Sequence, residues 1–217
     1  MAVYLESEQD PLPEPNDADR NGLVAIGGQL TTKRLLEAYR KGIFPWSQEP
    51  VTWWSPETRA VFYPLDIRIS KSLQKKLNQA PYEIRFNHDF NRVIHACAAP
   101  RKTESSWIGS QFTKAYCDLH ALGIAQSVEC WQGDDLVGGL YGLSLGGLFA
   151  GESMFFRKPD ASKIALVSLC QHLKAQGFLL IDSQVPNAFT LQMGAKCINR
   201  DTYLGLLKHA LSLPVSF

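Results

Sequence analysis

The chain has 217 residues, of which 45% are hydrophobic and 20% are charged. This length and composition predict a soluble globular protein with one substantial core, or a main domain with a small lobe. The formal net charge is only +1, so there is no broad basic field and any polyanionic partner must bind a local patch.

Targeting signals and metal-binding patterns are not evident. No apolar run approaches 18 residues, and the first residues are acidic and proline-rich instead of basic and then apolar, so we expect neither a membrane span nor a signal peptide. The five cysteines are scattered singly, without a Cys-x-x-Cys pair, which is typical of free thiols in a reducing compartment. We therefore expect a cytoplasmic protein without a metal or other cofactor.

The first 58 residues predict a small N-terminal lobe. Residues 1–20 are rich in proline and acids and predict an extended, partly mobile arm. Thr31 is expected to cap a helix that ends at about Lys41. The following stretch, GIFPWSQEPVTWWSPETRAVFYP, holds three tryptophans and four prolines. It predicts an irregular aromatic wall, in which Trp53 and Trp54 serve core or inter-lobe packing.

A larger domain is expected over residues 59–217, where the pattern becomes regular. Three alternating segments, AQSVECW, LVGGLYGLSL and LFAGES, are separated by short turns and predict an antiparallel meander. A long helix capped by Asp160 and a buried strand, FLLIDSQV, follow. Further strands are expected near 59–63, 66–69 and 82–86 and in AKCINR, and further helices at about 71–79, 88–98, 110–122, 187–193 and 202–211.

These elements predict an α+β fold with a mixed, mostly antiparallel sheet flanked by helices. A meander followed by a long helix and a buried strand is the order of the GNAT-like acyltransferase fold. Element order alone does not define a reaction, because one fold supports many chemistries.

Candidate polar residues lie close to the buried strand. Asp182 and Gln184 are separated by one residue and are expected to project from the same face. A buried aspartate needs hydrogen-bond partners, and a glutamine can link it to a ligand; the alternative is that both only bond loop backbone. Glu152 ends the meander and is expected at the same mouth, where two carboxylates and an amide suit an ammonium or guanidinium group. The alternative is a turn-stabilising glutamate.

No covalent triad is expected, because none of the five histidines lies beside a Gly-flanked serine or a plausible nucleophilic cysteine. Basic residues gather in DIRISKSLQKKL, where Lys71 and Lys75 are i, i+4 neighbours. This face is either only solvated or, together with exposed aromatic residues, a nucleic-acid surface. The basic candidates are Arg68, Lys71, Lys75, Lys76, Arg101 and Lys102.

Several longer runs resemble one family. The leucyl/phenylalanyl-tRNA–protein transferases are similar to this chain in the runs NGLVAIGGQLTTKRLLEAYRKGIFPW, WWSPETRAVFYP, SSWIG, AQSVECW, LVGGLYGLSLGGLFAGESMFFRKPDASK and LIDSQV, in this order and spacing. The resemblance extends from about Asn21 to the last helix. It implies an enzyme that moves leucine or phenylalanine, and sometimes methionine, from aminoacyl-tRNA to proteins with N-terminal Arg or Lys, which marks them for N-end rule degradation. We expect the protein to be a monomer.

The resemblance also implies roles for individual residues. Trp46 and Trp107 match the tryptophans that hold the terminal adenosine of the tRNA. Asp182 and Gln184 match the proposed catalytic pair, and Glu152 the GES glutamate. The aminoacyl side-chain pocket is implied to consist of Leu140, Phe149, Met154, Leu166 and Leu169.

The chain departs from the family pattern at three places. Ser183 stands where the family has cysteine, the loop to Phe189 lacks an Asn-x-His motif, and Leu140 stands where methionine is frequent. Two other interpretations remain: a CoA-dependent N-acetyltransferase, although FRKPDASK lacks the glycines that cradle a pyrophosphate, and an RNA-binding protein without catalysis.

Aminolysis of an activated ester suits a site without a triad or metal. An α-amine has a pKa of about 7.7 to 8.0, so only weak base assistance is needed, and positioning can supply most of the rate. Gln184 is expected to accept a hydrogen bond from the amine while Asp182 orients Gln184. The final proton acceptor stays open between the leaving 3′ oxygen and Asp182.

Overall fold

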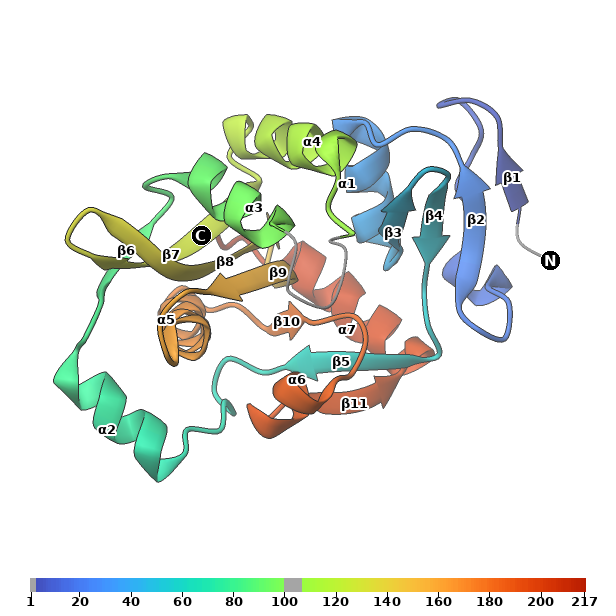
Figure 1. The fold of residues 1–217 in the computed structure, drawn as a ribbon. Coiled ribbons are helices and arrows are strands. Elements are labelled where there is room, and N and C mark those ends of the chain that lie inside the picture. Colours follow the sequence, from blue (N-terminus) through green and yellow to red (C-terminus); the bar gives the residue numbers. More distant parts are fainter. Residues whose placement is uncertain (1–2, 100–106) are drawn as a thin grey trace.

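The computed structural model describes residues 3–99 and 107–217, and within them the strands form two sheets (Figure 1). The N-terminal sheet has four strands in the order β1-β2-β4-β3. Its elements are β1 (Val3–Leu5), β2 (Leu23–Gly27), α1 (Thr32–Lys41), β3 (Phe44–Gln48) and β4 (Val51–Trp54).

The sequence interpretation of this lobe needs two corrections. The stretch expected to be irregular forms the β3–β4 hairpin: Val51 and Trp53 are buried while Thr52 and Trp54 are half-buried, as strand periodicity requires. The arm expected to be mobile is tied down, because β1 pairs in parallel with β2 and the buried Arg34 donates to backbone carbonyls of the arm.

The larger sheet has seven strands in the order β11-β5-β10-β9-β8-β7-β6. All neighbouring pairs are antiparallel except β9 and β10, which are parallel and joined through α5. The predicted α+β fold with a mixed, mostly antiparallel sheet is therefore confirmed. The elements are β5 (Thr58–Phe62), β6 (Glu83–Phe86), β7 (Ala125–Gln132), β8 (Asp135–Leu145), β9 (Leu148–Phe156), α5 (Ala161–Ala175), β10 (Leu180–Asp182) and β11 (Lys196–Asn199).

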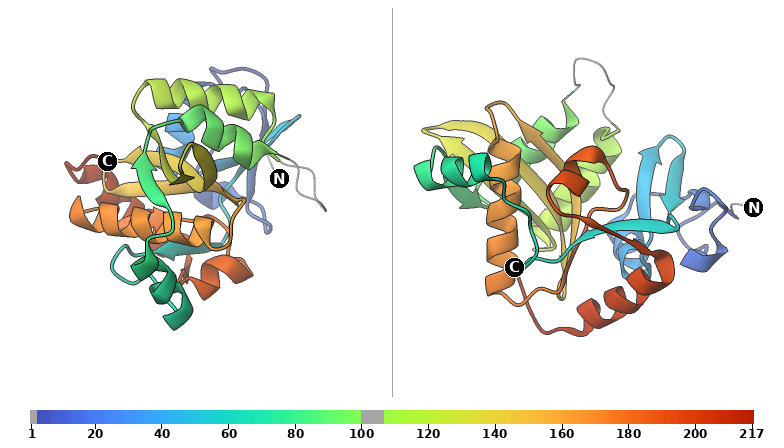
Figure 2. Two further views of the ribbon diagram at one scale, coloured as in Figure 1. Left: turned by 60° about the vertical axis from the view of Figure 1, so that its left-hand side comes forward. Right: turned by 90° about the horizontal axis from the view of Figure 1, so that it is seen from below.

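Helices cover both faces of this sheet (Figures 1 and 2). On one face α3 (Phe90–Ala98) and α4 (Ser110–Ala121) pack in a hydrophobic cluster that also contains Trp53 and Tyr141, so the core continues into the N-terminal lobe. On the other face α5 packs in a cluster with Leu140 and Phe149. None of the described helices is long and apolar enough to cross a membrane. The remaining α-helices are α2 (Lys71–Gln79), α6 (Ala188–Gln192) and α7 (Arg200–Ser212).

Two expected strands differ from the structure. Residues 66–69 form no strand: both edges of β5 are already occupied by β10 and β11, and the N–H of Arg68 donates to the carbonyl of Met193 in a loop. The buried strand expected from FLLIDSQV is only Leu180–Asp182, because Gln184 adopts a left-handed backbone with φ +51°. The chain therefore leaves the sheet directly after Asp182.

Candidate active site

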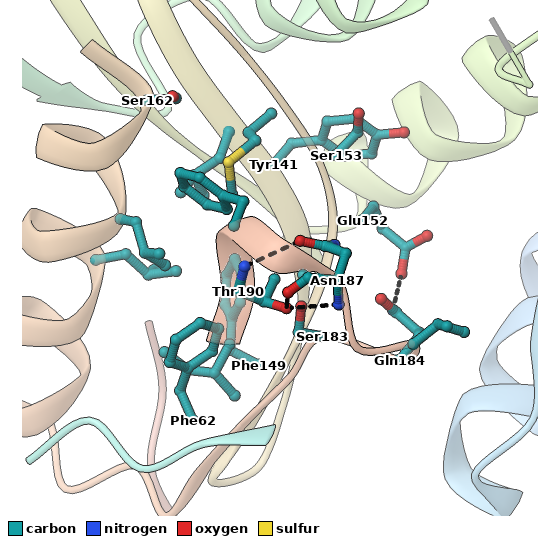
Figure 3. Close-up of a pocket in the computed structure, with 18 of the residues that line it drawn as sticks. Phe62, Tyr141, Phe149, Glu152, Ser153, Ser162, Ser183, Gln184, Asn187 and Thr190 are labelled. Carbon is teal, nitrogen blue, oxygen red and sulfur yellow. Dashed lines mark hydrogen bonds between the residues drawn. The ribbon is translucent and has the colours of Figure 1, made fainter. Parts of the chain in front are cut away.

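A large cavity opens where β9 and β10 separate. The two strands pair only from Leu148 to Ala150 on β9, whereas β9 continues to Phe156. The following residues of β9 line a cavity of about 1060 Å³ together with α5, the segment after β10 and the β3 strand of the N-terminal lobe (Figure 3). The sheet itself thus creates the opening, which is where α/β proteins commonly place a ligand.

The apolar part of the wall comes from several strands and helices. The five pocket residues that the resemblance implies, which are Leu140, Phe149, Met154, Leu166 and Leu169, all line the cavity. Residue reasoning missed Phe62 and Phe189, which lie on the same wall. Phe189, in the first turn of α6, ends the segment in which the expected Asn-x-His motif is absent, so this departure reaches the cavity directly.

Aromatic side chains form part of the cavity wall. Trp46 is 42% exposed and Trp107 is half-buried, and both line the cavity although they come from β3 and from the segment before α4. Trp46 is held edge-on against Trp54 with ring centroids 5.4 Å apart, and Trp107 against Phe112 at 5.0 Å. An indole that is supported from behind and exposed in front is suited to stacking on a planar ring.

The loop after β10 leads into α6 through a helix N-cap. Asn187 caps α6 by accepting a hydrogen bond from the N–H of Thr190, whose hydroxyl accepts from the N–H of Asn187. Both residues line the cavity with Ser183 (Figure 3). The sequence analysis did not assign Asn187 and Thr190 to the site, although Asn-x-x-Thr before a short helix is a recognisable capping signal.

Glu152 and Gln184 meet on the cavity wall. The Gln184 Nε2 donates to Glu152 Oε1 at 3.2 Å (Figure 3). The other carboxylate oxygen accepts from the Tyr116 hydroxyl at 2.8 Å, and Tyr116 and Tyr39 share a hydrogen bond of 2.6 Å between their hydroxyls. Burial raises the pKa of Glu152 to about 7, against the lowering effect of the tyrosine hydrogen bonds. This glutamate is therefore poised between its charged and neutral forms near neutral pH.

The backbone of Gln184 is fixed at both ends. Its N–H donates to Asp182 Oδ1 at 2.9 Å, and its carbonyl accepts from the N–H of Ala60 at 2.9 Å. A left-handed conformation is unfavourable for a residue with a side chain and persists only where surrounding bonds impose it. These bonds direct the carboxamide toward Glu152.

Asp182 is buried beneath this turn. Its carboxylate binds Arg59 through two hydrogen bonds, Nε to Oδ1 at 2.9 Å and Nη2 to Oδ2 at 2.7 Å, and Oδ2 also accepts from the Tyr203 hydroxyl at 2.8 Å. The side chains of Asp182 and Arg59 are both only 1% exposed. The expectation that Asp182 and Gln184 share a face is wrong, because the positive φ of Gln184 turns its side chain into the cavity while Asp182 points into the core.

The predicted basic residues lie apart from the cavity. Arg68, Lys71, Lys75 and Lys76 are all exposed, on α2 or directly before it, and none lines the cavity wall. Leu73 anchors α2 with its buried side chain, which leaves these cations on the outside. Arg101 and Lys102 lie outside the described residues.

The described part of the chain forms no metal site, and two of its thiols are kept protonated by burial. Among residues 3–99 and 107–217 no three His, Cys, Asp or Glu side chains form a group able to hold a metal ion. Burial raises the pKa of the Cys130 and Cys170 thiols to about 12, which leaves them protonated at neutral pH. The cavity wall combines the Glu152 carboxyl group and the Gln184 amide with aromatic and apolar side chains and with other polar residues, among them Ser183, Asn187 and Thr190.

Comparisons with known proteins identify the family of this chain. Residues 61–208 match the family model described as "Leucyl/phenylalanyl-tRNA protein transferase", and residues 28–57 match the model of the N-terminal domain of that family. A relative from Shewanella woodyi named leucyl/phenylalanyl-tRNA–protein transferase is 49% identical, over 98% of this chain and 92% of the relative. One with the same name from Pseudomonas putida is 48% identical, over 100% of this chain and 98% of the relative.

These matches place the chain among the transferases. In particular, it belongs to the leucyl/phenylalanyl-tRNA–protein transferase family. A solved structure of L-PGS from Bacillus licheniformis is similar with a TM-score of 0.46 at 11% identity, over 88% of this chain and 71% of that chain.

Proposed function

We propose that the cavity holds the aminoacyl end of leucyl- or phenylalanyl-tRNA, and that the enzyme passes the aminoacyl group to the N-terminal amine of a protein beginning with Arg or Lys. The observation that carries this proposal is that the Gln184–Glu152 pair lines the same cavity as the tryptophans and the apolar residues. A single binding space thus offers surfaces for an adenine, an aliphatic or aromatic side chain and an amine.

The reaction is aminolysis of an ester. The acceptor nitrogen attacks the aminoacyl carbonyl, the C–N bond forms, and the bond to the 3′ oxygen of the tRNA breaks. Because the ester is already activated and part of the amine is neutral near pH 7, positioning supplies most of the rate, with effective molarities of about 10⁵ to 10⁸ M.

Gln184 is the residue that we propose to meet the attacking amine. Its Nε2 donates to Glu152, which leaves the amide oxygen to accept a hydrogen bond from the acceptor. Asp182 contributes to catalysis in this proposal by holding the N–H of Gln184 and thereby its unusual backbone. In this proposal Gln184 contacts the substrate from the cavity wall, and Asp182 supports Gln184 from behind that wall.

Glu152 is proposed to bind the acceptor. Its carboxylate lines the cavity beside Gln184 and supplies negative charge for an α-ammonium group or for a basic side chain. This role agrees with acceptors that begin with Arg or Lys.

The aminoacyl side chain is proposed to lie against Leu140, Phe149, Met154, Leu166 and Leu169. A hydrophobic pocket distinguishes one methylene by only about 1 to 3 kcal/mol, so methionine should be tolerated. The adenine is proposed to stack on Trp46 and Trp107, and the phosphates to bind Arg68, Lys71, Lys75 and Lys76.

This proposal treats residues 1–58 as the N-terminal lobe and residues 59–217 as the catalytic domain. The enzyme acts as a monomer, without a cofactor, and in the cytoplasm, where aminoacyl-tRNAs are made. Its products are N-terminally extended proteins marked for degradation.

The proposal is tested by incubating the purified protein with labelled Phe-tRNA and a peptide that begins with Arg, beside peptides that begin with Lys and Gly. Transfer to the Arg and Lys peptides and not to the Gly peptide is the expected result. A parallel reaction with labelled acetyl-CoA serves as the control for acetyl transfer. Label that enters peptide only from acetyl-CoA, or tRNA binding without transfer, would contradict the proposal.

A further inference from the structure

The proton released during aminolysis needs an acceptor within the cavity. The attacking amine, which reacts in its neutral form, must lose one proton to become an amide, while the leaving 3′ oxygen must gain one. Gln184 cannot take a proton at neutral pH, because a carboxamide is too weak a base. The proposed function therefore leaves one chemical role unassigned.

Asp182 is not placed to take this role. Its side chain is 1% exposed, and Arg59, Tyr203 and the N–H of Gln184 together satisfy its two oxygens. A proton delivered there would break an ion pair that is buried on both sides. Such a pair is strongly destabilised when one partner loses its charge.

Glu152 is placed differently. It lines the cavity, and its Oε1 already accepts a hydrogen bond from the residue that we assign to the amine. Its other oxygen is bonded to the Tyr116 hydroxyl, which in turn contacts the Tyr39 hydroxyl. These two tyrosines come from α4 and α1, so the carboxyl group is anchored from behind while its front side faces the cavity.

We propose that Glu152 is the proton acceptor of the transfer reaction, a role that rests on the proposed function. Its carboxylate takes a proton from the acceptor nitrogen as the C–N bond forms. The resulting carboxylic acid donates that proton to the 3′ oxygen as the C–O bond breaks. Protons and charges balance within one turnover, because the free amine and the ester yield an amide and a ribose hydroxyl.

The surroundings of Glu152 suit both protonation states. Burial raises its pKa to about 7, which makes it a useful base and a useful acid near neutral pH. The Asp160–Lys163 ion pair of the α5 N-terminus lies on the same cavity wall and is internally neutralised. The ionisable groups that act on Glu152 or lie next to it are Tyr39, Tyr116, Tyr141, Arg59 and Asp182.

Chemical rescue separates proton transfer from simple charge attraction. Glu152→Ala should lower the single-turnover transfer rate by about 10² to 10⁴-fold, as expected for loss of a general base. Imidazole, a neutral base with a pKa near the 6.5 of histidine, should then raise the transfer rate of this variant at least about tenfold. Acetate, with a pKa near the 4.3 of free glutamate, should restore less. Rescue by acetate and not by imidazole would overturn the proposal. A transfer rate of Glu152→Ala within about threefold of the wild-type rate would overturn it too.

A second variant tests the same role without removing the carboxyl group. Tyr116→Phe deletes a hydrogen bond that lowers the pKa of Glu152, so this pKa should rise and the acidic limb of the rate profile should move to higher pH. The ratio of the wild-type rate to the variant rate should therefore increase as the pH falls below about 8. The acceptor amine titrates equally with both enzymes, so its titration cancels in this ratio. A ratio independent of pH would overturn the proposal, whether or not rescue is seen.

The activity of the wild-type protein distinguishes a failure of the proposed function from a failure of the proposed role of Glu152. If it transfers nothing from Phe-tRNA to the Arg peptide, the proposed function itself is contradicted. If it transfers while the rescue pattern or the Tyr116→Phe ratio fails, only the role of Glu152 is wrong.

Discussion

Arg59→Met should cause a large loss of stability. Arg59 and Asp182 are joined by two hydrogen bonds of 2.9 and 2.7 Å, and both side chains are 1% exposed. The guanidinium also lies over the rings of Phe44 and Tyr203, at 4.8 and 4.3 Å from their centroids. Methionine keeps much of the apolar stem and of the volume, so the main effect is an uncompensated buried carboxylate. Breaking such a pair costs about 3 to 5 kcal/mol.

This loss is a large fraction of the free energy of unfolding of a typical domain, which is about 5 to 15 kcal/mol. The assay is urea unfolding followed by circular dichroism, with the midpoint and the slope fitted for each variant. Adding Asp182→Leu should recover part of the loss, because the double variant no longer buries an unpaired charge. The two substitutions should therefore be non-additive by about 0.5 to 3 kcal/mol.

Lys114→Met is the matched control. Lys114 and Asp118 are 2.6 Å apart on one helix, but their side chains are 77% and 49% exposed. Solvent screens such a pair, so the change should cost only about 0.3 to 0.5 kcal/mol. If Arg59→Met costs no more than Lys114→Met, the reasoning that Asp182 is a sealed, charge-paired residue is refuted.

Three further predictions concern other parts of the molecule. Trp46→Ala should weaken Phe-tRNA binding by about 1 to 3 kcal/mol for one lost stacked base, and unchanged affinity in a filter-binding assay would exclude this contact. Lys71→Ala with Lys75→Ala should reduce the slope of log affinity against log salt by about 2, and an equal slope would place the phosphates elsewhere. Gly142→Ala should lower the unfolding midpoint, because an added Cβ would overlap the Ala150 carbonyl oxygen; an equal midpoint would contradict this.

The sequence predicts the central part of the fold well and the N-terminal lobe poorly. The β7–β8–β9 meander was predictable because Gly133 and Gly146 mark turns between alternating segments, and both adopt positive φ. The β3–β4 hairpin was not, because Pro45, Pro50 and neighbouring tryptophans obscure the alternation. Strand β1 carries too few residues for a period to be visible. Strand β10 was expected, but it is shorter than predicted because the chain leaves the sheet after Asp182.

The sequence and the resemblance named part of the cavity wall, but not Phe62, Asn187 or Thr190, and not the geometry. Period-two reasoning put Asp182 and Gln184 on one face, and it failed because no glycine signals the left-handed backbone at Gln184. Arg59 was missed because its partner is 123 positions away, although a buried aspartate implies that a cation must lie nearby. Trp46 and Trp107 lie on separate elements, so only the resemblance indicated that they share a cavity.

The most direct test of this account is a crystal structure of the protein with a hydrolysis-resistant amide of phenylalanine and adenosine. The account predicts the phenyl ring against Leu140, Phe149 and Leu169, the adenine against Trp46 or Trp107, and the carbonyl carbon within reach of Gln184. Well-defined density for the analogue outside this cavity, or with the phenyl ring at the tryptophans, would contradict it.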